Sequence, residues 1–69
     1  PALAVQVLRR CLSLVPWSEP HHRALIQCFA DLGQRAAALA QLDSCRRALR
    51  AELDVAPGDD TLALSRTIN

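Results

Sequence analysis

The sequence contains no lysine, tyrosine or methionine, and it has only one tryptophan, one phenylalanine and two glycines among its 69 residues. Aromatic residues favour strands, so their scarcity argues against a β-sheet protein. Alanine and leucine contribute twelve residues each, and both favour helices. The composition therefore predicts an all-α protein, and the length allows one domain at most.

Long apolar runs and an excess of positive charge are also missing. No run approaches the roughly 18 apolar residues of a membrane span, and the amino end lacks the order of a signal peptide, so we expect a soluble, cytoplasmic chain without membrane contact. Eight arginines against seven acidic residues give a net charge of +1. Because counterion release from a phosphate backbone needs a basic surface, we expect no direct nucleic-acid binding.

The three cysteines, Cys11, Cys28 and Cys45, are odd in number and share no CxxC spacing. This pattern argues against a closed disulfide framework and against a zinc site. All three fall on apolar stripes of expected helices, so we predict reduced, buried thiols that react slowly. The sequence predicts neither a metal nor another cofactor.

Apolar residues recur at helical spacing in four segments, which predicts helices at 2–15, 19–32, 36–53 and 60–68. Pro16 and Pro20 bracket a loop, because proline is tolerated in the first turn of a helix and disfavours helix in the residue before it. Gly33 is expected to close the second helix in the left-handed conformation. The order predicts antiparallel helices joined by short connections.

Polar residues at the expected helix starts predict the caps. Ser18 is the expected N-cap of the second helix, where its hydroxyl would accept from a first-turn amide. Glu19 follows it and complements the positive end of the helix. Asp59 or Asp60 is expected to cap the fourth helix.

An internal repeat of 34 residues relates the first predicted helix to the third. This period is that of the tetratricopeptide repeat, in which helix pairs stack because one pair cannot bury its apolar faces alone. The central pair, 19–53, carries three further positions of that pattern, Leu25, Phe29 and Gly33. The recurring residues are Ala4, Leu8 and Cys11, which return as Ala38, Leu42 and Cys45.

Three motifs stand out in the sequence: His22, Arg23, Leu25 and Ile26; Gly33, Ala38 and Leu39; and Cys45, Arg46, Arg47, Leu49, Glu52, Leu53, Val55 and Pro57. Together they resemble the bacterial transcriptional activator domain, a tetratricopeptide-like family, over about residues 4–68. Asp54 departs from the glycine that the family often has, but a short polar residue tolerates the same turn geometry. The resemblance implies contacts between domains or protomers of a bacterial regulator, beside a winged-helix DNA-binding domain, and no catalysis. A helical scaffold of a signalling ATPase or another multidomain regulator is the alternative.

An enzyme is the least favoured interpretation. A nucleophile at Cys28 would need His21 or His22 and Asp31 nearby, yet Cys28 lies on the apolar stripe of its helix, where a thiol behaves as a small hydrophobe. A metal held by the two histidines and Cys28 is equally disfavoured. Adjacent histidines diverge by about 100° on a helix and do not readily face one ion.

Two polar sets are candidate interaction sites. The first is a row at steps of four on the second helix, which would line a groove or simply face water. The second is a cationic patch on the third helix, but Asp43 and Asp54 are spaced to pair with two of its arginines, which favours a self-neutralised surface. The row consists of Arg23, Gln27 and Asp31, and the patch consists of Arg46, Arg47 and Arg50.

The first and last helices are expected to lack a neighbour. Residues 2–15 correspond to the second helix of one repeat and residues 60–68 to the first helix of the next. Leu3, Val7 and Leu14 give the first helix a second apolar face that one neighbour does not cover. We therefore predict that the chain contacts protein partners and associates with itself.

Overall fold

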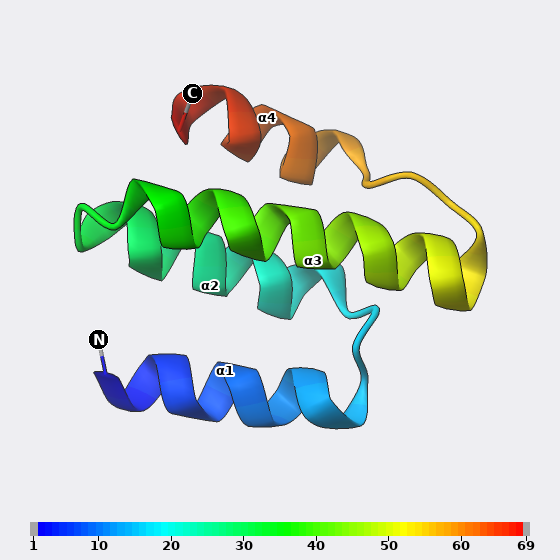
Figure 1. The fold of residues 1–69 in the computed structure, drawn as a ribbon, viewed down its shortest axis with the longest axis horizontal. Coiled ribbons are helices and arrows are strands. Elements are labelled where there is room, and N and C mark those ends of the chain that lie inside the picture. The colour runs from blue at the N-terminus through cyan, green and yellow to red at the C-terminus, as the bar shows by residue number, and fades with distance from the viewer. Residues whose placement is uncertain (1, 69) are drawn as a thin grey trace.

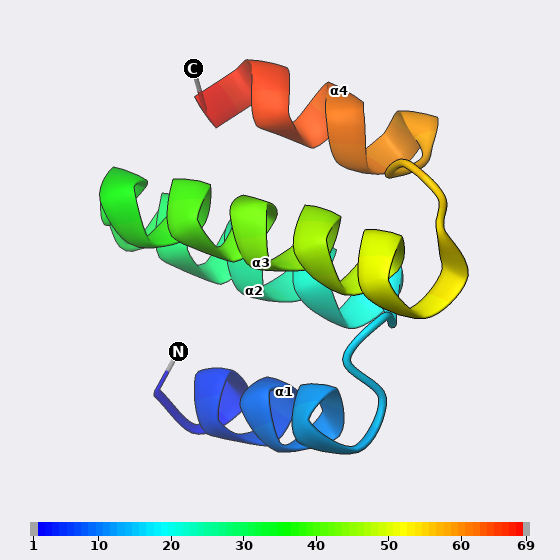
Figure 2. The same ribbon diagram turned by 45° about the vertical axis from the view of Figure 1, so that its right-hand side comes forward.

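Four α-helices make up the computed structural model, which describes residues 2–68. They run antiparallel in chain order, with α1 at one edge, α4 at the opposite edge, and α2 and α3 between them (Figure 1 and Figure 2). No strand occurs within residues 2–68, so the predicted all-α, tetratricopeptide-like fold is confirmed. The helices are α1 (Ala2–Leu14), α2 (Glu19–Asp31), α3 (Arg35–Leu53) and α4 (Asp59–Ile68).

A residue with a left-handed backbone conformation follows each helix of the central pair. Gly33 has φ +74°, which costs glycine nothing, and the next amide, that of Gln34, donates to the carbonyl of Phe29 at 2.8 Å. Asp54 closes α3 with φ +52°, a conformation that a short polar residue tolerates better than a bulky one. The predicted turn at Gly33 is confirmed, and α2 ends at Asp31, one residue earlier than expected.

The predicted side-chain caps were wrong. Ser18 occupies the N-cap position of α2, but its hydroxyl lies 2.5 Å from Nδ1 of His21 and bonds no amide. Gly58 precedes α4, and its carbonyl accepts from the Leu62 amide at 3.1 Å. Asp59 therefore lies inside the first turn of α4, where its charge still complements the positive helix end.

The apolar core lies where α2 and α3 face each other. Leu25, Ile26 and Phe29 from α2 meet Ala38 and Leu42 from α3, and all five are buried. Helix α2 packs against α1, α3 and α4, so it lies at the centre of the bundle. Partly buried side chains of α1, α3 and α4 complete the core: Val5, Leu8, Leu12, Ala37, Leu64 and Ile68 pack against it.

Candidate interaction surface

Helix α1 packs on one side only. Among residues 2–68 it contacts α2, and no other helix lies along its outer side (Figure 1 and Figure 2). Leu3, Val7 and Leu14 are 73%, 53% and 77% exposed. Three large apolar side chains on a single helix thus face outward.

Burial along α1 is lower than at the equivalent positions of α3. Ala38 is fully buried, whereas Ala4 is exposed, although both belong to the same position of the 34-residue repeat. The difference arises because α3 packs against both α2 and α4, while α1 has one neighbour. The same contrast holds for the remaining repeat positions: Leu8 and Cys11 are less buried than Leu42 and Cys45.

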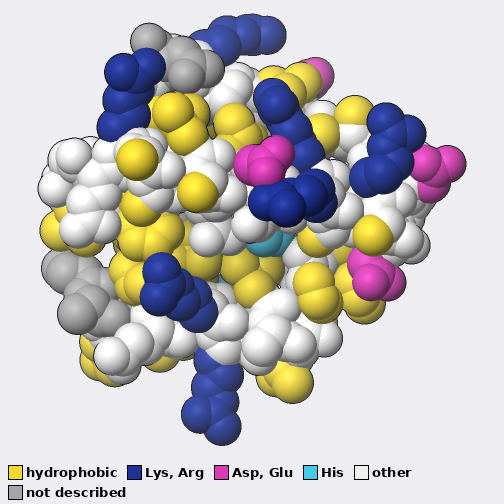
Figure 3. All heavy atoms as spheres, in the orientation of Figure 1, with side chains coloured by type: hydrophobic (Ala, Val, Ile, Leu, Met, Phe, Trp, Pro, Cys, Tyr) yellow, Lys and Arg dark blue, Asp and Glu magenta, His cyan; other side chains and the backbone are white. Residues whose placement is uncertain are grey.

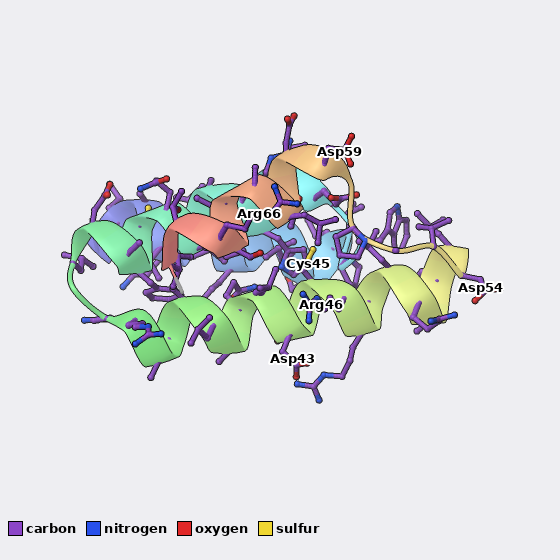
Figure 4. All side chains as sticks on the ribbon, turned by 90° about the horizontal axis from the view of Figure 1, so that it is seen from above. Asp43, Cys45, Arg46, Asp54, Asp59 and Arg66 are labelled. Atoms are coloured by element: carbon purple, nitrogen blue, oxygen red, sulfur yellow. The ribbon has the colours of Figure 1, made fainter. Side chains whose placement is uncertain are left out.

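The opposite edge of the bundle is polar. Helix α4 packs against α2 and α3 and buries Thr61 and Ser65. Its exposed positions include Asp59, Asp60 and Arg66, and Figure 4 shows Asp59 projecting outward at the start of the helix. No large hydrophobic side chain of α4 is exposed within the described residues. Within residues 2–68 no helix lies along the outer side of α4 either (Figure 1), but its exposed positions are mainly polar, unlike those of α1.

A hollow of about 290 Å³ separates α1 from α3, with α2 as its floor. Leu12, Leu25 and Ala48 line it, and hydrophobic side chains gather in this hollow between the two helices (Figure 3). Arg9 stands at its margin, with its guanidinium 5.7 Å from the centre of the Phe29 ring. That distance is within the range of a cation–π contact, which holds Arg9 against α2.

His22 joins the three elements around this hollow. Its Nε2 lies 2.7 Å from the carbonyl oxygen of Pro16 in the α1–α2 loop, and its Nδ1 lies 2.8 Å from the amide nitrogen of Gln41 on α3. A carbonyl only accepts and an amide nitrogen only donates, so the proton of the ring is on Nε2. The side chain is 3% exposed, so His22 acts as a buried structural link.

Glu19 connects the start of α2 to the start of α4. Its Oε2 accepts from the Gly58 amide at 3.0 Å and from the Thr61 hydroxyl at 2.7 Å. Arg23 lies 3.8 Å from the same oxygen and donates to the Thr61 hydroxyl at 3.3 Å. The Thr61 hydrogen bond is the main cause that lowers the pKa of Glu19 below its ordinary value. These contacts join residues 39 and 42 positions apart, which sequence spacing did not reveal.

The predicted polar row on α2 divides into two environments. Arg23 is half-buried against α4, so it does not lie on an open groove. Gln27 and Asp31 are exposed and bond to each other at 2.8 Å. They line a second hollow of about 300 Å³, which Thr67 and Ile68 of α4 also border. Only this end of the row faces open space.

The predicted cationic patch on α3 is largely neutralised. Arg47 pairs with Asp43 at 2.6 Å, and Arg50 pairs with Asp54 at 3.3 Å, as the spacing predicted. Both pairs are exposed, and Asp43 and Asp54 project away from the bundle (Figure 4). Arg46 is exposed and has no ion-pair partner within residues 2–68. Such exposed pairs contribute little to stability, so the patch is a solvated surface.

The family model of the bacterial transcriptional activator domain matches residues 2–69. This chain belongs to that family. Comparison with curated proteins and with solved structures gives no match. Family membership identifies the chain as a region of the bacterial transcriptional activator type, and the helical bundle is the fold of this regulatory module. None of its described helices combines the length and the apolar character of a membrane span.

The thiols of this family member lie in different environments. Cys45 is fully buried between the helices (Figure 4), and burial raises the pKa of its thiol to about 11. Cys11 and Cys28 are only half-buried, so the prediction of three buried thiols was wrong for these two.

Two of the residues suspected of catalysis form hydrogen bonds to other residues: His21 bonds to Ser18 and Asp31 bonds to Gln27. Within residues 2–68 no three His, Cys, Asp or Glu side chains are grouped as a metal site.

Proposed function

We propose that this chain is a non-catalytic interaction module of a bacterial transcriptional regulator, and that α1 contributes the contact with another domain or protomer. The exposed apolar face of α1 is the observation that carries the proposal. Leu3, Val7 and Leu14 expose more than half of their area on a helix with one neighbour. Adjacent apolar side chains that remain exposed in a folded domain mark surfaces for protein contact.

The parent regulator is proposed to carry a winged-helix DNA-binding domain elsewhere and to act in the cytoplasm. Membership in a transcriptional activator family supports this role over that of a scaffold in a signalling ATPase. The net charge of +1, with Arg47 and Arg50 paired to acids, argues that this region does not itself bind nucleic acid. The module therefore acts through protein contacts.

Self-association of the chain follows from the same surface. At high protein concentration, the apolar face of α1 is expected to pair with that of a second copy, because burial of apolar area favours association. Sedimentation over a concentration series tests this expectation. A single monomeric species throughout would contradict it.

Substitution of the α1 face in the intact regulator tests the proposed function. The double variant Val7→Asp with Leu14→Asp places two charges on this face, at positions already exposed to water, so the fold is expected to persist. Transcription from a reporter promoter should be lost, while an electrophoretic shift with promoter DNA should persist. The matched control is Leu32→Asp, which alters a 50% exposed leucine at the α2–α3 turn and should leave transcription unchanged. Full activation by the double variant would refute the proposal.

A further inference from the structure

We propose that the hollow between α1 and α3 binds a small carboxylate with a short aliphatic or aromatic body. Its walls and floor come from three consecutive helices, so the outer faces of the bundle play no part in it. Two observations point to such a ligand: the hollow is open and largely apolar, and Arg9 at its margin has no acidic partner within residues 2–68. This ligand site goes beyond the proposed function and does not depend on it.

The hollow exists because α3 presents small side chains toward α1. Ser44 and Ala48 form the α3 wall, Leu12 belongs to the α1 wall, and Leu25 of α2 lies in the floor. The backbones of α1 and α3 do not approach each other closely within residues 2–68, although α2 contacts both helices. A volume of about 290 Å³ therefore remains between them, close to the lower end of the range for small-molecule pockets.

Few polar groups of the lining are available to a ligand. His22 already uses both of its ring nitrogens in hydrogen bonds within the bundle. The Ser13 hydroxyl donates to the Arg10 carbonyl at 2.6 Å. Ser44 is exposed on the α3 wall, and its hydroxyl can rotate toward a ligand. The donors that remain for a ligand are thus the Arg9 guanidinium and the Ser44 hydroxyl.

The charge of Arg9 selects an anion. No carboxylate lines the hollow within the described residues, so nothing there neutralises this guanidinium. The guanidinium carbon lies 5.7 Å from the centre of the Phe29 ring, a contact that uses the face of the guanidinium and leaves the N–H groups along its edge available. That edge matches a carboxylate through two parallel hydrogen bonds. The apolar floor then suits an aliphatic or aromatic body on the same molecule.

Other anionic occupants fit this hollow less well. A phosphate group carries about 1.5–2 negative charges near neutral pH, whereas the hollow offers one guanidinium. A protein partner of ordinary affinity covers about 800 Å² of surface on each side, far more than a hollow of this size provides. A small molecule with one carboxylate agrees with both the charge and the volume.

A ligand in this position would connect α1 to α3. Helix α1 contacts only α2 among the described helices, so a molecule that touches both walls gives it a second support. Binding to the folded chain should therefore raise its Tm. This effect links occupancy of the hollow to how firmly α1 is held.

Titration of the isotope-labelled 69-residue chain with phenylbutyrate tests the inference, with backbone amide resonances as the readout. The matched probes are phenylbutyramide, which lacks the charge, and acetate, which lacks the apolar body. Phenylbutyrate should shift the resonances of Leu12, Leu25 and Ser44 along one saturating curve. Phenylbutyramide should bind about tenfold more weakly because it loses the charge-assisted hydrogen bonds. Acetate should shift none of these resonances at the same concentration.

Three variants provide the second arm. Arg9→Gln alters an exposed side chain, so the fold is expected to persist, and circular dichroism checks it. It should bind phenylbutyrate about tenfold more weakly and phenylbutyramide as before. The matched control is Arg10→Gln, at an exposed position of the same helix that does not line the hollow, and it should bind both probes as the unaltered chain does. Ser44→Leu fills the hollow from the α3 wall and should abolish binding of both.

Several results would overturn the inference. These are no saturable shift with phenylbutyrate, shifts centred on residues outside the hollow, equal affinity for the acid and the amide, a loss in Arg10→Gln as large as in Arg9→Gln, and unchanged binding in Ser44→Leu. An acidic peptide that displaces phenylbutyrate and binds more tightly would assign the hollow to a protein partner and overturn the small ligand. None of these results alters the outcome expected for the α1 face variant in the transcription assay, so the two proposals fail separately.

Discussion

The carboxylate of Glu19 offers the sharpest test of how the stack is held together. In Glu19→Ala the Thr61 hydroxyl loses its acceptor at 2.7 Å, and Thr61 is fully buried. A buried donor left without a partner costs about 1–3 kcal/mol. The Gly58 amide is exposed and regains a bond to water, so its loss adds little. We therefore expect a decrease of about 2 kcal/mol in the free energy of unfolding.

Chemical and thermal unfolding measure this change. For a domain of this size, about 2 kcal/mol corresponds to a Tm lower by roughly 8–16 °C. Glu19→Gln retains an acceptor oxygen, so it should cost about half as much. The control is Glu52→Gln, an exposed acid of α3 with no ion-pair partner within the described residues. In a Thr61→Val background the cost of Glu19→Ala should shrink by about 1 kcal/mol. A stability of Glu19→Ala within about 0.5 kcal/mol of the unaltered chain would refute the reasoning.

The same carboxylate gives a pH dependence. The folded chain lowers the pKa of Glu19 below its ordinary value of 4.5, so folding favours the ionised form. Its contribution is therefore complete above pH 4.5 and is lost as the pH falls through the lowered pKa. Glu19→Gln should remove this part of the acid dependence, as unfolding over a pH series will show. Identical acid profiles for the two proteins would contradict the assignment.

Three further predictions concern packing, thiols and the turn after α3. Ala38→Leu should destabilise the fold by about 1–3 kcal/mol because Ala38 is fully buried, whereas Ala40→Leu, at an exposed site of the same helix, should be nearly neutral in urea unfolding. Thiol titration of the folded chain should label Cys11 faster than Cys45, whose pKa is raised to about 11, and equal rates would contradict the burial argument. Asp54→Ala should cost about 1 kcal/mol at its positive φ, while Asp54→Gly should not.

Local spacing predicted most of the fold. Pro16, Pro20 and Gly33 set the first loop and the central turn because each restricts or frees the backbone at its own position. The ion pairs of α3 were predictable because residues four apart on a helix are neighbours.

Contacts between distant segments escaped prediction. Glu19 meets Gly58 and Thr61 across 39 and 42 residues, and no local pattern encodes that approach. For the same reason Arg23 was expected to line a groove or face water, although it contacts Thr61 of α4 and is half-buried. The Ser18 cap failed because His21, three residues later, competes for its hydroxyl.

The interaction surface was only partly predictable. The two apolar faces of α1 indicated uncovered residues such as Val7 and Leu14, and the structure locates them on the side away from α2. The outer side of α4 is also uncovered within residues 2–68, but its exposed positions are mainly polar, a contrast with α1 that helical spacing did not show. Which side chains of an edge helix remain exposed depends on how the helices pack against one another, and local spacing does not determine that packing.

Hydrogen exchange along α1 tests the central claim most directly, because amide protection reports how firmly a helix is held. In the 69-residue chain, α1 contacts only α2, so its amides should exchange faster than those of α3. In the intact regulator with its partner present, α1 amides should slow to the rate of α3. Val7→Asp with Leu14→Asp should remove that gain. Equal protection of α1 with and without the partner would contradict the claim that its open face is the site of contact.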